Sequence, residues 1–322
     1  MMIKILVARA VFPEVLEKLA QHFEVESNQQ DTIFSEAELA ARMRDKWAVI
    51  ATASERIGAA TIASSPHLKA ICNMAVGFNN IDIAAASAAR VMVTNTPDVL
   101  NETTADFAWA LLMATARRVS ESEHWLRAGK WKKWQYDGFL GTDVHGSTLG
   151  IIGMGRIGQA IARRSLGFNM KVIYHNRSRV STDLEQGANN AFYVSKEELL
   201  SISDHVILAL PHSVTSHHTI GARELAQMKP TATLINIARG GIVDDAALIN
   251  VLKHRRIAAA GLDVFENEPA FHPDFLTLSN VVLTPHIASA SESTRRAMAN
   301  CAADNLIASL TGQQPPNLLN PF

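Results

Sequence analysis

Three residues, Arg239, Glu268 and His286, are of the types that could carry out acid–base chemistry on a carboxylate substrate. Each comes after a short apolar run that is typical of a buried strand. These runs are Thr233–Ile237, Ala258–Leu262 and Val281–Leu283. Ligands of parallel α/β sheets bind beyond the carboxyl ends of the strands, so we expect the three side chains to face one crevice.

The three side chains fit complementary roles in the reduction of a small 2-keto acid. An arginine can hold a carboxylate through two charge-assisted hydrogen bonds and so orient the neighbouring carbonyl. A histidine titrates near neutrality and can give a proton to the carbonyl oxygen. A carboxylate beside it can fix its tautomer and favour the imidazolium form. A lone arginine or histidine is more often structural, so this interpretation depends on their order and setting.

A glycine-rich motif, Gly153-Met154-Gly155-Arg156-Ile157-Gly158, predicts a dinucleotide site. It follows the apolar run Leu149–Ile152 and opens a predicted helix, which is the context that makes such a motif specific. Gly153 permits the tight turn, Gly155 lets a pyrophosphate approach the backbone, and Gly158 lets the helix pack on the strand. The N-terminus of the helix would offer free N–H groups to the phosphates. The alternative is a glycine-rich turn without a ligand.

The residues after the next predicted strand favour NADP(H) as the cofactor. Sites for NAD usually carry an acid there, about 20 residues after the motif, that bonds the ribose 2′-hydroxyl. The strand Lys171–Tyr174 leads instead into His175-Asn176-Arg177-Ser178-Arg179, and the first acid is Asp183. Arginines would pair with a 2′-phosphate, whereas an acid would repel it. We therefore expect NADP(H), with NAD(H) as the second option and a solvated basic loop as the alternative.

Two series of strands alternating with helices indicate two α/β units, because parallel strands need a crossover connection. The first series fills about the first hundred residues, and the second begins near Thr148. Between them, residues 103–130 predict a long helical region that Asn101 can cap. Trp125, Trp131 and Trp134 lie near its far end and are typical of a packed interface.

Composition excludes several classes of partner. The 322 residues carry 30 Lys and Arg against 31 Asp and Glu, so nothing favours nucleic acid or an anionic membrane. No apolar run approaches the roughly 18 residues of a membrane helix. Cys72 and Cys301 form neither a redox pair nor a disulfide framework. The His217-His218 pair has no Cys or acid nearby in the sequence, and we expect it to be exposed. We therefore predict a cytoplasmic protein without a metal site.

Four stretches of the chain resemble the D-isomer-specific 2-hydroxyacid dehydrogenase family. The glycine motif is followed by Asn236–Asp244, Ala260–Pro269 and Thr284–Ser289, in the order and spacing of that family. The likeness continues upstream through Val76–Asp82 and Asn95-Thr96-Pro97, so it covers essentially the whole chain. One departure is Ala288, which stands where the family commonly has glycine.

The resemblance implies an α/β fold of two Rossmann-like or flavodoxin-like domains with parallel sheets and a cleft between them. Residues 1–100 and 287–322 would form the substrate domain, and residues 101–286 the dinucleotide-binding domain. A dimerisation arm at about 101–147 would make the protein a homodimer.

The resemblance also implies roles for individual residues. Arg239 would be the substrate anchor, His286 the acid–base group and Glu268 its partner. The substrate would also contact Ser289 and the backbone N–H groups of Val76 and Gly77. Outside the glycine motif, cofactor contacts would come from Thr104, Asn176, Arg177, Ser178, Leu210, Pro211, Ala238 and Asp263.

Within the family, the likeness is greatest to the glyoxylate/hydroxypyruvate reductases that also reduce 2-ketogluconate, on Gly141–His145 and Asn176-Arg177. This implies NADPH-dependent reduction of small 2-keto acids to D-2-hydroxy acids. Two alternatives stay open. One is another dehydrogenase of the family, acting on formate or phosphite. The other is an NAD(H)-sensing scaffold used in transcriptional co-repression.

Overall fold

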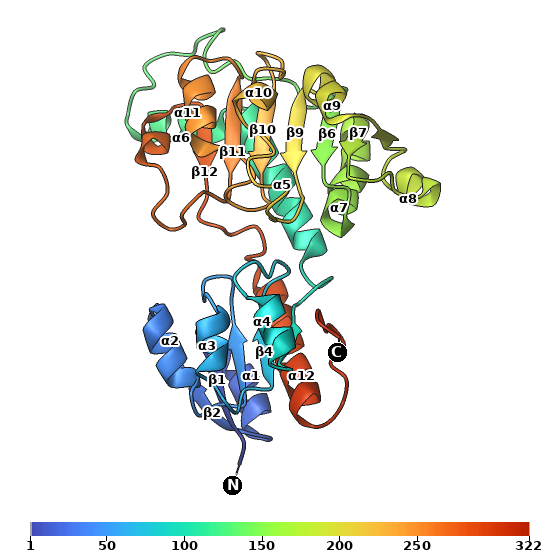
Figure 1. Cartoon of the computed structure of the whole chain (residues 1–322). Helices are drawn as coiled ribbons and strands as arrows, with labels where there is room; N and C mark the ends of the chain where they lie inside the picture. Colours follow the sequence, from blue (N-terminus) through green and yellow to red (C-terminus); the bar gives the residue numbers. More distant parts are fainter. Residues whose placement is uncertain (1, 322) are drawn as a thin grey trace. The chain divides into compact units, whose positions relative to one another are not determined.

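Residues 2–321 are described from a computed structural model (Figure 1). The chain divides into two compact units, and each contains one parallel sheet between helices. Unit 1 comprises Met1–Leu100 and Ala290–Phe322, and unit 2 comprises Asn101–Ser289. The second boundary therefore falls three residues later than the sequence motifs suggested.

The sheet of unit 1 has five parallel strands in the order β2-β1-β3-β4-β5. Its strands are β1 (Lys4–Val7), β2 (Glu24–Ser27), β3 (Ala48–Ala51), β4 (Ala70–Asn73) and β5 (Met92–Thr94). Its helices are α1 (Pro13–Ala20), α2 (Glu36–Met43), α3 (Ala59–Ala63), α4 (Ile83–Ala88) and α12 (Glu292–Leu310). β2 was not expected, because an edge strand with the sequence Glu-Val-Glu-Ser has little apolar signal.

Alternating side chains of unit 1 build two apolar layers, one on each face of the sheet. Ile5 and Val7 pack with residues of α1 and α12, whereas Leu6 packs with residues of α2, α3 and α4. The predicted capping box is confirmed, since the Ser35 hydroxyl accepts from Glu38 N and the Glu38 carboxylate accepts from Ser35 N.

The sheet of unit 2 has seven parallel strands in the order β12-β11-β10-β9-β6-β7-β8. Its strands are β6 (Thr148–Ile152), β7 (Lys171–His175), β8 (Phe192–Tyr193), β9 (His205–Leu208), β10 (Thr233–Asn236), β11 (Ala259–Leu262) and β12 (Val281–Leu283). Its α-helices are α5 (Asn101–Ala116), α6 (Val119–Arg127), α7 (Arg156–Arg164), α8 (Thr182–Gly187), α9 (Lys196–Ile202), α10 (Ala222–Leu225) and α11 (Asp245–Lys253).

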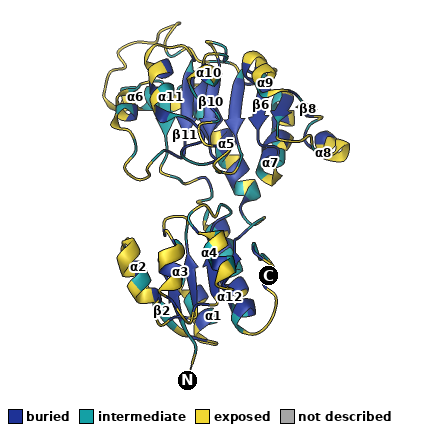
Figure 2. Cartoon of the chain, viewed as in Figure 1, coloured by how far each residue is buried: buried dark blue, intermediate teal, exposed yellow. Residues whose placement is uncertain are grey.

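Helices cover both faces of this second sheet. Leu149, Ile151 and Ile207 pack with residues of α5 and α7, whereas Val206 and Leu234 pack with residues of α9, α10 and α11. Figure 2 shows the consequence: the strands are buried, and the helices expose only their outer faces. The expectation of two α/β units with parallel sheets is confirmed.

The helical region expected over residues 103–130 consists of two helices, α5 and α6. α5 begins at Asn101, which is therefore its first residue rather than its cap, and ends at Ala116. Arg118 has a left-handed backbone (φ 54°) and separates α5 from α6. Its guanidinium bonds the Glu121 carboxylate at 2.8 and 2.9 Å and the Leu140 carbonyl at 3.3 Å. A long-range contact thus fixes a break that no glycine or proline marks in the sequence.

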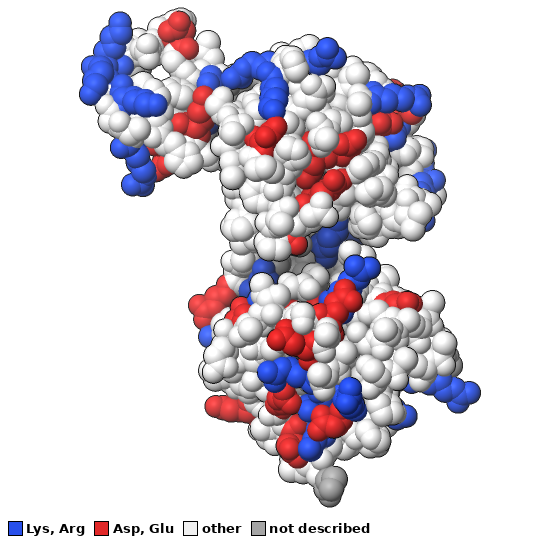
Figure 3. Space-filling model, turned by 60° about the vertical axis from the view of Figure 1, so that its left-hand side comes forward, with Lys and Arg blue, Asp and Glu red and all other residues white. Residues whose placement is uncertain are grey.

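Basic and acidic side chains are interspersed over the face shown in Figure 3, in keeping with the net charge of −1. Within residues 2–321, every helix is too short or too polar to cross a bilayer.

Candidate active site

The glycine motif forms the turn between β6 and α7, at the carboxyl edge of the sheet of unit 2. Gly153 has a φ of +106°, and a Cβ there would lie 2.6 Å from the Ala209 carbonyl. A Cβ on Gly158 would lie 2.1 Å from the Gly153 carbonyl oxygen. A Cβ on Gly155 would meet nothing within 4 Å, so open space lies over the start of α7. A pyrophosphate could therefore approach this backbone, as a dinucleotide requires.

The residues expected at the adenosine ribose follow β7. The Asn176 side chain accepts a hydrogen bond of 2.8 Å from Met154 N and so ties the glycine turn to the end of β7. Arg177 and Ser178 are exposed and have no side-chain partner among residues 2–321. They are free to meet a ligand at this edge.

Arg179 is not free to pair with a 2′-phosphate, as the sequence suggested it would be. Its guanidinium bonds both oxygens of Glu185 at 2.8 and 2.7 Å. Tyr174 donates to the same carboxylate at 2.7 Å. These bonds, Arg179 first and Tyr174 second, lower the pKa of Glu185 to about 2. Of the two arginines after β7, only Arg177 can offer an unpaired charge to a ligand.

The other residues expected to contact the cofactor lie in unit 2, next to the glycine turn, after β10 and on α5. Ala209-Leu210 adjoins the glycine turn, because a Cβ on Gly153 would also lie 2.8 Å from Leu210 N. Pro211 follows at once and its carbonyl accepts from the Ser216 hydroxyl at 2.9 Å. Ala238 is buried after β10, and Thr104 is buried on α5.

Arg239 lies just after β10, where the sequence placed it. Its guanidinium donates to the Ala238 carbonyl at 2.9 Å. Burial lowers the pKa of Arg239, and the charge of Glu268 acts in the opposite direction. The next residue must be glycine, since a Cβ on Gly240 would lie 1.7 Å from the Phe265 carbonyl oxygen. The arginine is thus held on a tightly packed turn near a carboxylate.

Glu268 and His286 lie in hydrogen-bond contact, and their predicted acid–base role stays a prediction. His286 Nδ1 lies 2.7 Å from Glu268 Oε2, and both side chains keep about a third of their surface exposed (36% and 31%). Glu268 Oε1 accepts from Phe265 N at 2.8 Å, which orients the carboxylate. Burial raises the pKa of Glu268, but the bond and charge of His286 outweigh it, so the pKa lies below its usual range. The pair can therefore exchange a proton with a ligand through the other ring nitrogen, Nε2.

Asp263 supports the loop that carries His286. It is fully buried and accepts from Thr284 Oγ1, Ile287 N and Ala288 N, each at 2.8 Å. Its own carbonyl accepts from His286 N at 2.9 Å. His286 has a left-handed backbone (φ 53°), a conformation that such a non-glycine residue keeps only when its surroundings enforce it. The expected contact of Asp263 with the cofactor stays a prediction.

The loop after β4 in unit 1 carries Val76 and Gly77. Asn95 donates to the Val76 carbonyl at 2.9 Å, and Asn73 donates to the Gly77 carbonyl at 2.8 Å. The N–H groups of Val76 and Gly77 have no acceptor within residues 2–321. The two asparagines thus fix the carbonyls and leave the N–H groups free to bind an anion. Asn73 and Asn95 were missed from the sequence, because amides that bond distant carbonyls have no local spacing.

Three histidines gather beside Gly241 in unit 2. A Cβ on Gly241 would lie 3.2 Å from His212 Nε2 and 3.1 Å from His217 Nδ1. The rings of His217 and His218 stack at 3.9 Å, and His218 Nε2 bonds the Glu266 carboxylate. Both histidines are exposed, as expected, and the carboxylate that His218 bonds comes from 48 residues further along the chain. Throughout the described chain, no three His, Cys, Asp or Glu side chains are placed to hold a metal.

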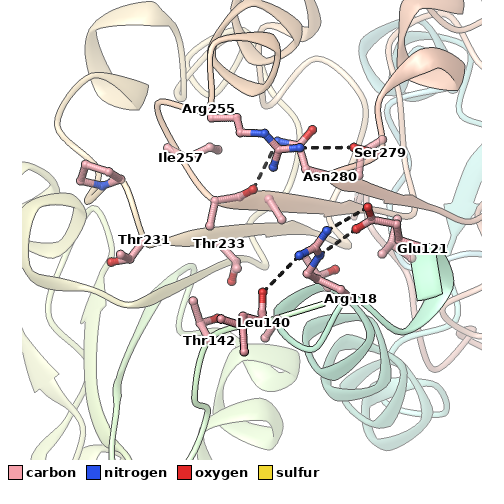
Figure 4. A pocket seen from close by; sticks show the side chains of 18 residues that line it. Arg118, Glu121, Leu140, Thr142, Thr231, Thr233, Arg255, Ile257, Ser279 and Asn280 are labelled. Carbon is pink, nitrogen blue, oxygen red and sulfur yellow. Dashed lines mark hydrogen bonds and ion pairs between the residues drawn. The ribbon is translucent and has the colours of Figure 1, made fainter. Parts of the chain in front are cut away.

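A cavity of about 270 Å³ lies at the opposite, amino-terminal edge of the same sheet (Figure 4). It is lined by the starts of β10, β11 and β12 and by the break between α5 and α6. Arg118 and Glu121 pair on one side, and Arg255 donates to the Ser279 hydroxyl at 3.4 Å on the other. None of the candidate catalytic or cofactor residues lines it.

Comparison with known proteins agrees with this geometry. The sequence profile of the D-isomer specific 2-hydroxyacid dehydrogenase NAD binding domain matches residues 109–288. Glyoxylate reductases of Thermococcus gammatolerans and Pyrococcus furiosus are 46% and 45% identical to the chain. The alignments cover 98% of this chain and 96% and 95% of those proteins.

Solved structures are similar over the full length. A D-isomer specific 2-hydroxyacid dehydrogenase from Polaromonas, described as putative in that structure, has a TM-score of 0.91 and 38% identity, covering 99% of this chain and all of that one. An NADPH-dependent glyoxylate/hydroxypyruvate reductase from Sinorhizobium meliloti, in complex with NADP and malonate, has a TM-score of 0.88 and 34% identity, covering 99% and 97%. The chain therefore belongs to the D-isomer specific 2-hydroxyacid dehydrogenase family of NAD(P)-dependent oxidoreductases.

Proposed function

We propose that the protein reduces small 2-keto acids, glyoxylate and hydroxypyruvate first among them, to D-2-hydroxy acids with NADPH. The observation that carries this proposal is the His286–Glu268 pair at 2.7 Å, near Arg239 on the same sheet edge. The similarity to glyoxylate reductases over 98% of the chain supports the substrate class. Reduction of 2-ketogluconate is included in the proposal.

Different residues of this chain would bind the substrate and donate the proton. Arg239 and the N–H groups of Val76 and Gly77 would hold the substrate carboxylate and so fix the position of the carbonyl. Ser289 would add a polar contact. When bound, the reduced nicotinamide supplies the hydride that adds to the carbonyl carbon. His286 would give its Nε2 proton to the carbonyl oxygen, and Glu268 on Nδ1 would stabilise the imidazolium beforehand.

The residues proposed to hold the cofactor are those of the glycine turn, the residues after β7, Leu210, Pro211, Ala238, Thr104 and Asp263. Arg177 would contact the 2′-phosphate of NADPH, with Ser178 as a hydrogen-bond donor. Its unpaired, exposed guanidinium supports a preference for NADPH, whereas Arg179 is neutralised by Glu185. No acidic side chain stands at 176–179 to bind a ribose 2′-hydroxyl.

Two further parts of the proposal concern the units and their assembly. Unit 1 would be the substrate domain and unit 2 the cofactor domain. The segment from α5 to residue 147 would be the dimerisation arm. Its aromatic side chains Trp131, Trp134 and Tyr136 are 59%, 73% and 87% exposed in the single chain, which favours burial against a second copy. Sedimentation of the purified protein would distinguish a dimer from a monomer.

The proposed function is tested by the initial rates of NADPH and NADH oxidation with glyoxylate and with hydroxypyruvate, measured side by side. We expect turnover of both acids, with kcat/KM higher for NADPH than for NADH. Oxidation of neither cofactor, despite measurable cofactor binding, would contradict the proposed reaction. Turnover with NADH ahead of NADPH would contradict only the role of Arg177.

A further inference from the structure

Residues 317–320, the C-terminal segment, run antiparallel to β5 at the edge of the sheet of unit 1 (Figure 1). Leu319 N donates to the Val93 carbonyl at 2.8 Å, and the Asn320 side chain accepts from Val93 N at 2.7 Å. The segment therefore pairs an edge strand whose backbone groups would otherwise stay open.

Asn305 of α12 joins the C-terminal segment to the residues that follow β5. Its side chain is fully buried, and Nδ2 donates to the Asn95 carbonyl at 3.1 Å. Oδ1 accepts from the backbone N–H and from the side-chain amide of Asn317, each at 3.3 Å. Asn95 N in turn donates to the Asn317 carbonyl at 3.4 Å. The three asparagines thus form a closed set of hydrogen bonds, in which Asn305 must both donate and accept.

Asn95 connects this set of bonds to the loop proposed to hold the substrate carboxylate. Asn95 Nδ2 donates to the Val76 carbonyl at 2.9 Å, and Thr96 N donates to the Ala75 carbonyl at 3.0 Å. Asn95 is buried, so solvent would not replace a partner that it lost. The position of the Val76 carbonyl therefore depends on the position of Asn95.

The peptide unit between Val76 and Gly77 turns this dependence into control of an N–H direction. The Val76 carbonyl and the Gly77 N–H belong to one planar trans unit and point in opposite directions. The bond from Asn95 to the carbonyl therefore directs the Gly77 N–H away from Asn95, toward a side where the described part of the chain offers it no acceptor. Hydrogen bonds weaken as they depart from linearity, so a rotation of this unit would weaken the binding of an anion.

We propose that Asn305 is a positioning residue for the substrate carboxylate, because it holds Asn95 in place and so sets the direction of the Gly77 N–H. The inference rests on the proposed function and deepens it, since it extends the carboxylate site to a side chain on α12, 210 residues after Asn95. Asn305 contacts neither substrate nor cofactor in this proposal. It should therefore affect KM for the keto acid and not kcat.

Asn305→Ala removes the donor to Asn95 and the acceptor for Asn317, and initial rates with glyoxylate and NADPH measure the result. We expect KM for glyoxylate to rise about threefold, as for the loss of one hydrogen bond that acts indirectly. The values of kcat and of KM for NADPH should stay close to those of the parent. A fall in kcat with unchanged KM for glyoxylate, as in a partly unfolded protein, would overturn the inference.

Ser309→Ala is the matched control. Its buried hydroxyl also lies on α12, but it bonds a carbonyl of the same helix, that of Asn305, at 2.7 Å. This substitution removes a buried hydrogen bond without removing a bond to Asn95, so it should leave all three constants parental. A rise in KM for glyoxylate equal to that of Asn305→Ala would overturn the inference.

Asn305→Asp tests the same bond without creating a cavity. Burial raises the pKa of a carboxyl group, so at acid pH the introduced group is protonated and can donate to the Asn95 carbonyl as the amide does. Once ionised, it can only accept. We expect the ratio of KM for glyoxylate in this variant to that in the parent to rise with pH. A ratio of one at every pH would overturn the inference.

The double variant Asn95→Ala/Asn305→Ala shows whether Asn305 acts through Asn95. Without the Asn95 amide, Asn305 has no side-chain connection to Val76, so KM for glyoxylate should be that of Asn95→Ala alone. Multiplication of the two single effects would overturn the inference and leave the proposed function standing. If the parent protein does not reduce glyoxylate at all, the proposed function itself fails, and the inference with it.

Discussion

The carboxyl edges of the two sheets carry different kinds of chemical groups. At the carboxyl edge of the sheet of unit 2, ionisable groups interact with one another: Glu268 bonds His286, and Arg239 lies near Glu268. At the corresponding edge of unit 1, the groups left for a ligand are the backbone N–H groups of Val76 and Gly77. We propose that the first edge moves a proton, whereas the second only binds the substrate. Substitution of the proposed proton donor in unit 2 should therefore change kcat, and substitutions around the proposed carboxylate loop of unit 1 should change KM.

The largest effect is expected from removing the proton donor of unit 2. His286→Ala should lower kcat with glyoxylate by about two orders of magnitude or more, as for the loss of a general acid. Cofactor binding, measured by nucleotide fluorescence, should persist. His254→Ala, an exposed histidine on the same unit, is the control and should keep parental activity. Parental turnover in His286→Ala would contradict the proposal that the proton donor lies at the edge of the sheet of unit 2.

The second prediction concerns discrimination between the two cofactors, and not between substrates. Arg177→Ala should raise KM for NADPH by roughly tenfold or more and leave KM for NADH nearly unchanged, because only NADPH carries the 2′-phosphate. Arg223→Ala, another exposed arginine of unit 2, should change neither. Equal losses for NADPH and NADH would show that Arg177 acts through the loop and not through the phosphate.

The matching prediction for unit 1 concerns the amide that fixes the carboxylate loop. Asn95→Ala removes the bond to the Val76 carbonyl and should raise KM for glyoxylate about fivefold, since one hydrogen bond contributes about 1 kcal/mol. The value of kcat should change little. A fall in kcat comparable to that of His286→Ala would contradict the proposal that unit 1 binds the substrate and unit 2 transfers the proton.

The last prediction concerns stability and not activity, and it separates buried charge from catalysis in unit 2. Burial, with the charges of Glu266 and Asp244, raises the pKa of Asp245 to about 6 from 3.8, against the bond from Glu266 N. The folded state therefore binds its proton more tightly than the unfolded state, and stability falls as pH rises from about 4 to 6. Asp245→Asn should be more stable than the parent above pH 6, by up to about 3 kcal/mol, and equal to it below pH 4.

Thermal unfolding at pH 4 and pH 7.5 checks this prediction. The parent should lose stability, relative to Asp245→Asn, over this interval, and kcat of the variant should stay parental. A variant that is less stable than the parent at pH 7.5 would show that the ionised carboxylate is favourable in the fold.

The sequence predicted those parts of the site that depend on local backbone requirements. Gly153 and Gly158 were identifiable because no side chain fits at either position. The His286–Glu268 pair was identifiable because both residues follow strands of one parallel sheet, whose carboxyl ends share an edge.

The features that were missed depend on contacts between distant residues. From the sequence, Arg179 appeared available to a phosphate. In the structure, its guanidinium bonds the carboxylate of Glu185, which lies on the helix that follows. Arg118 ends α5 through the Leu140 carbonyl, without a glycine or proline to mark the break. Asn73 and Asn95 orient their loop through carbonyl bonds that no spacing reveals. Long-range side-chain bonds of this kind override local propensity and leave little trace in a single sequence.

We propose that hydride and proton are delivered to a 2-keto acid so as to form the D-hydroxy acid. The most direct test is the reaction of hydroxypyruvate with NADPH deuterated at the transferable position of C4, followed by mass and chiral analysis of the glycerate. We expect D-glycerate with one deuterium on C2. L-glycerate, or glycerate without deuterium, would contradict it.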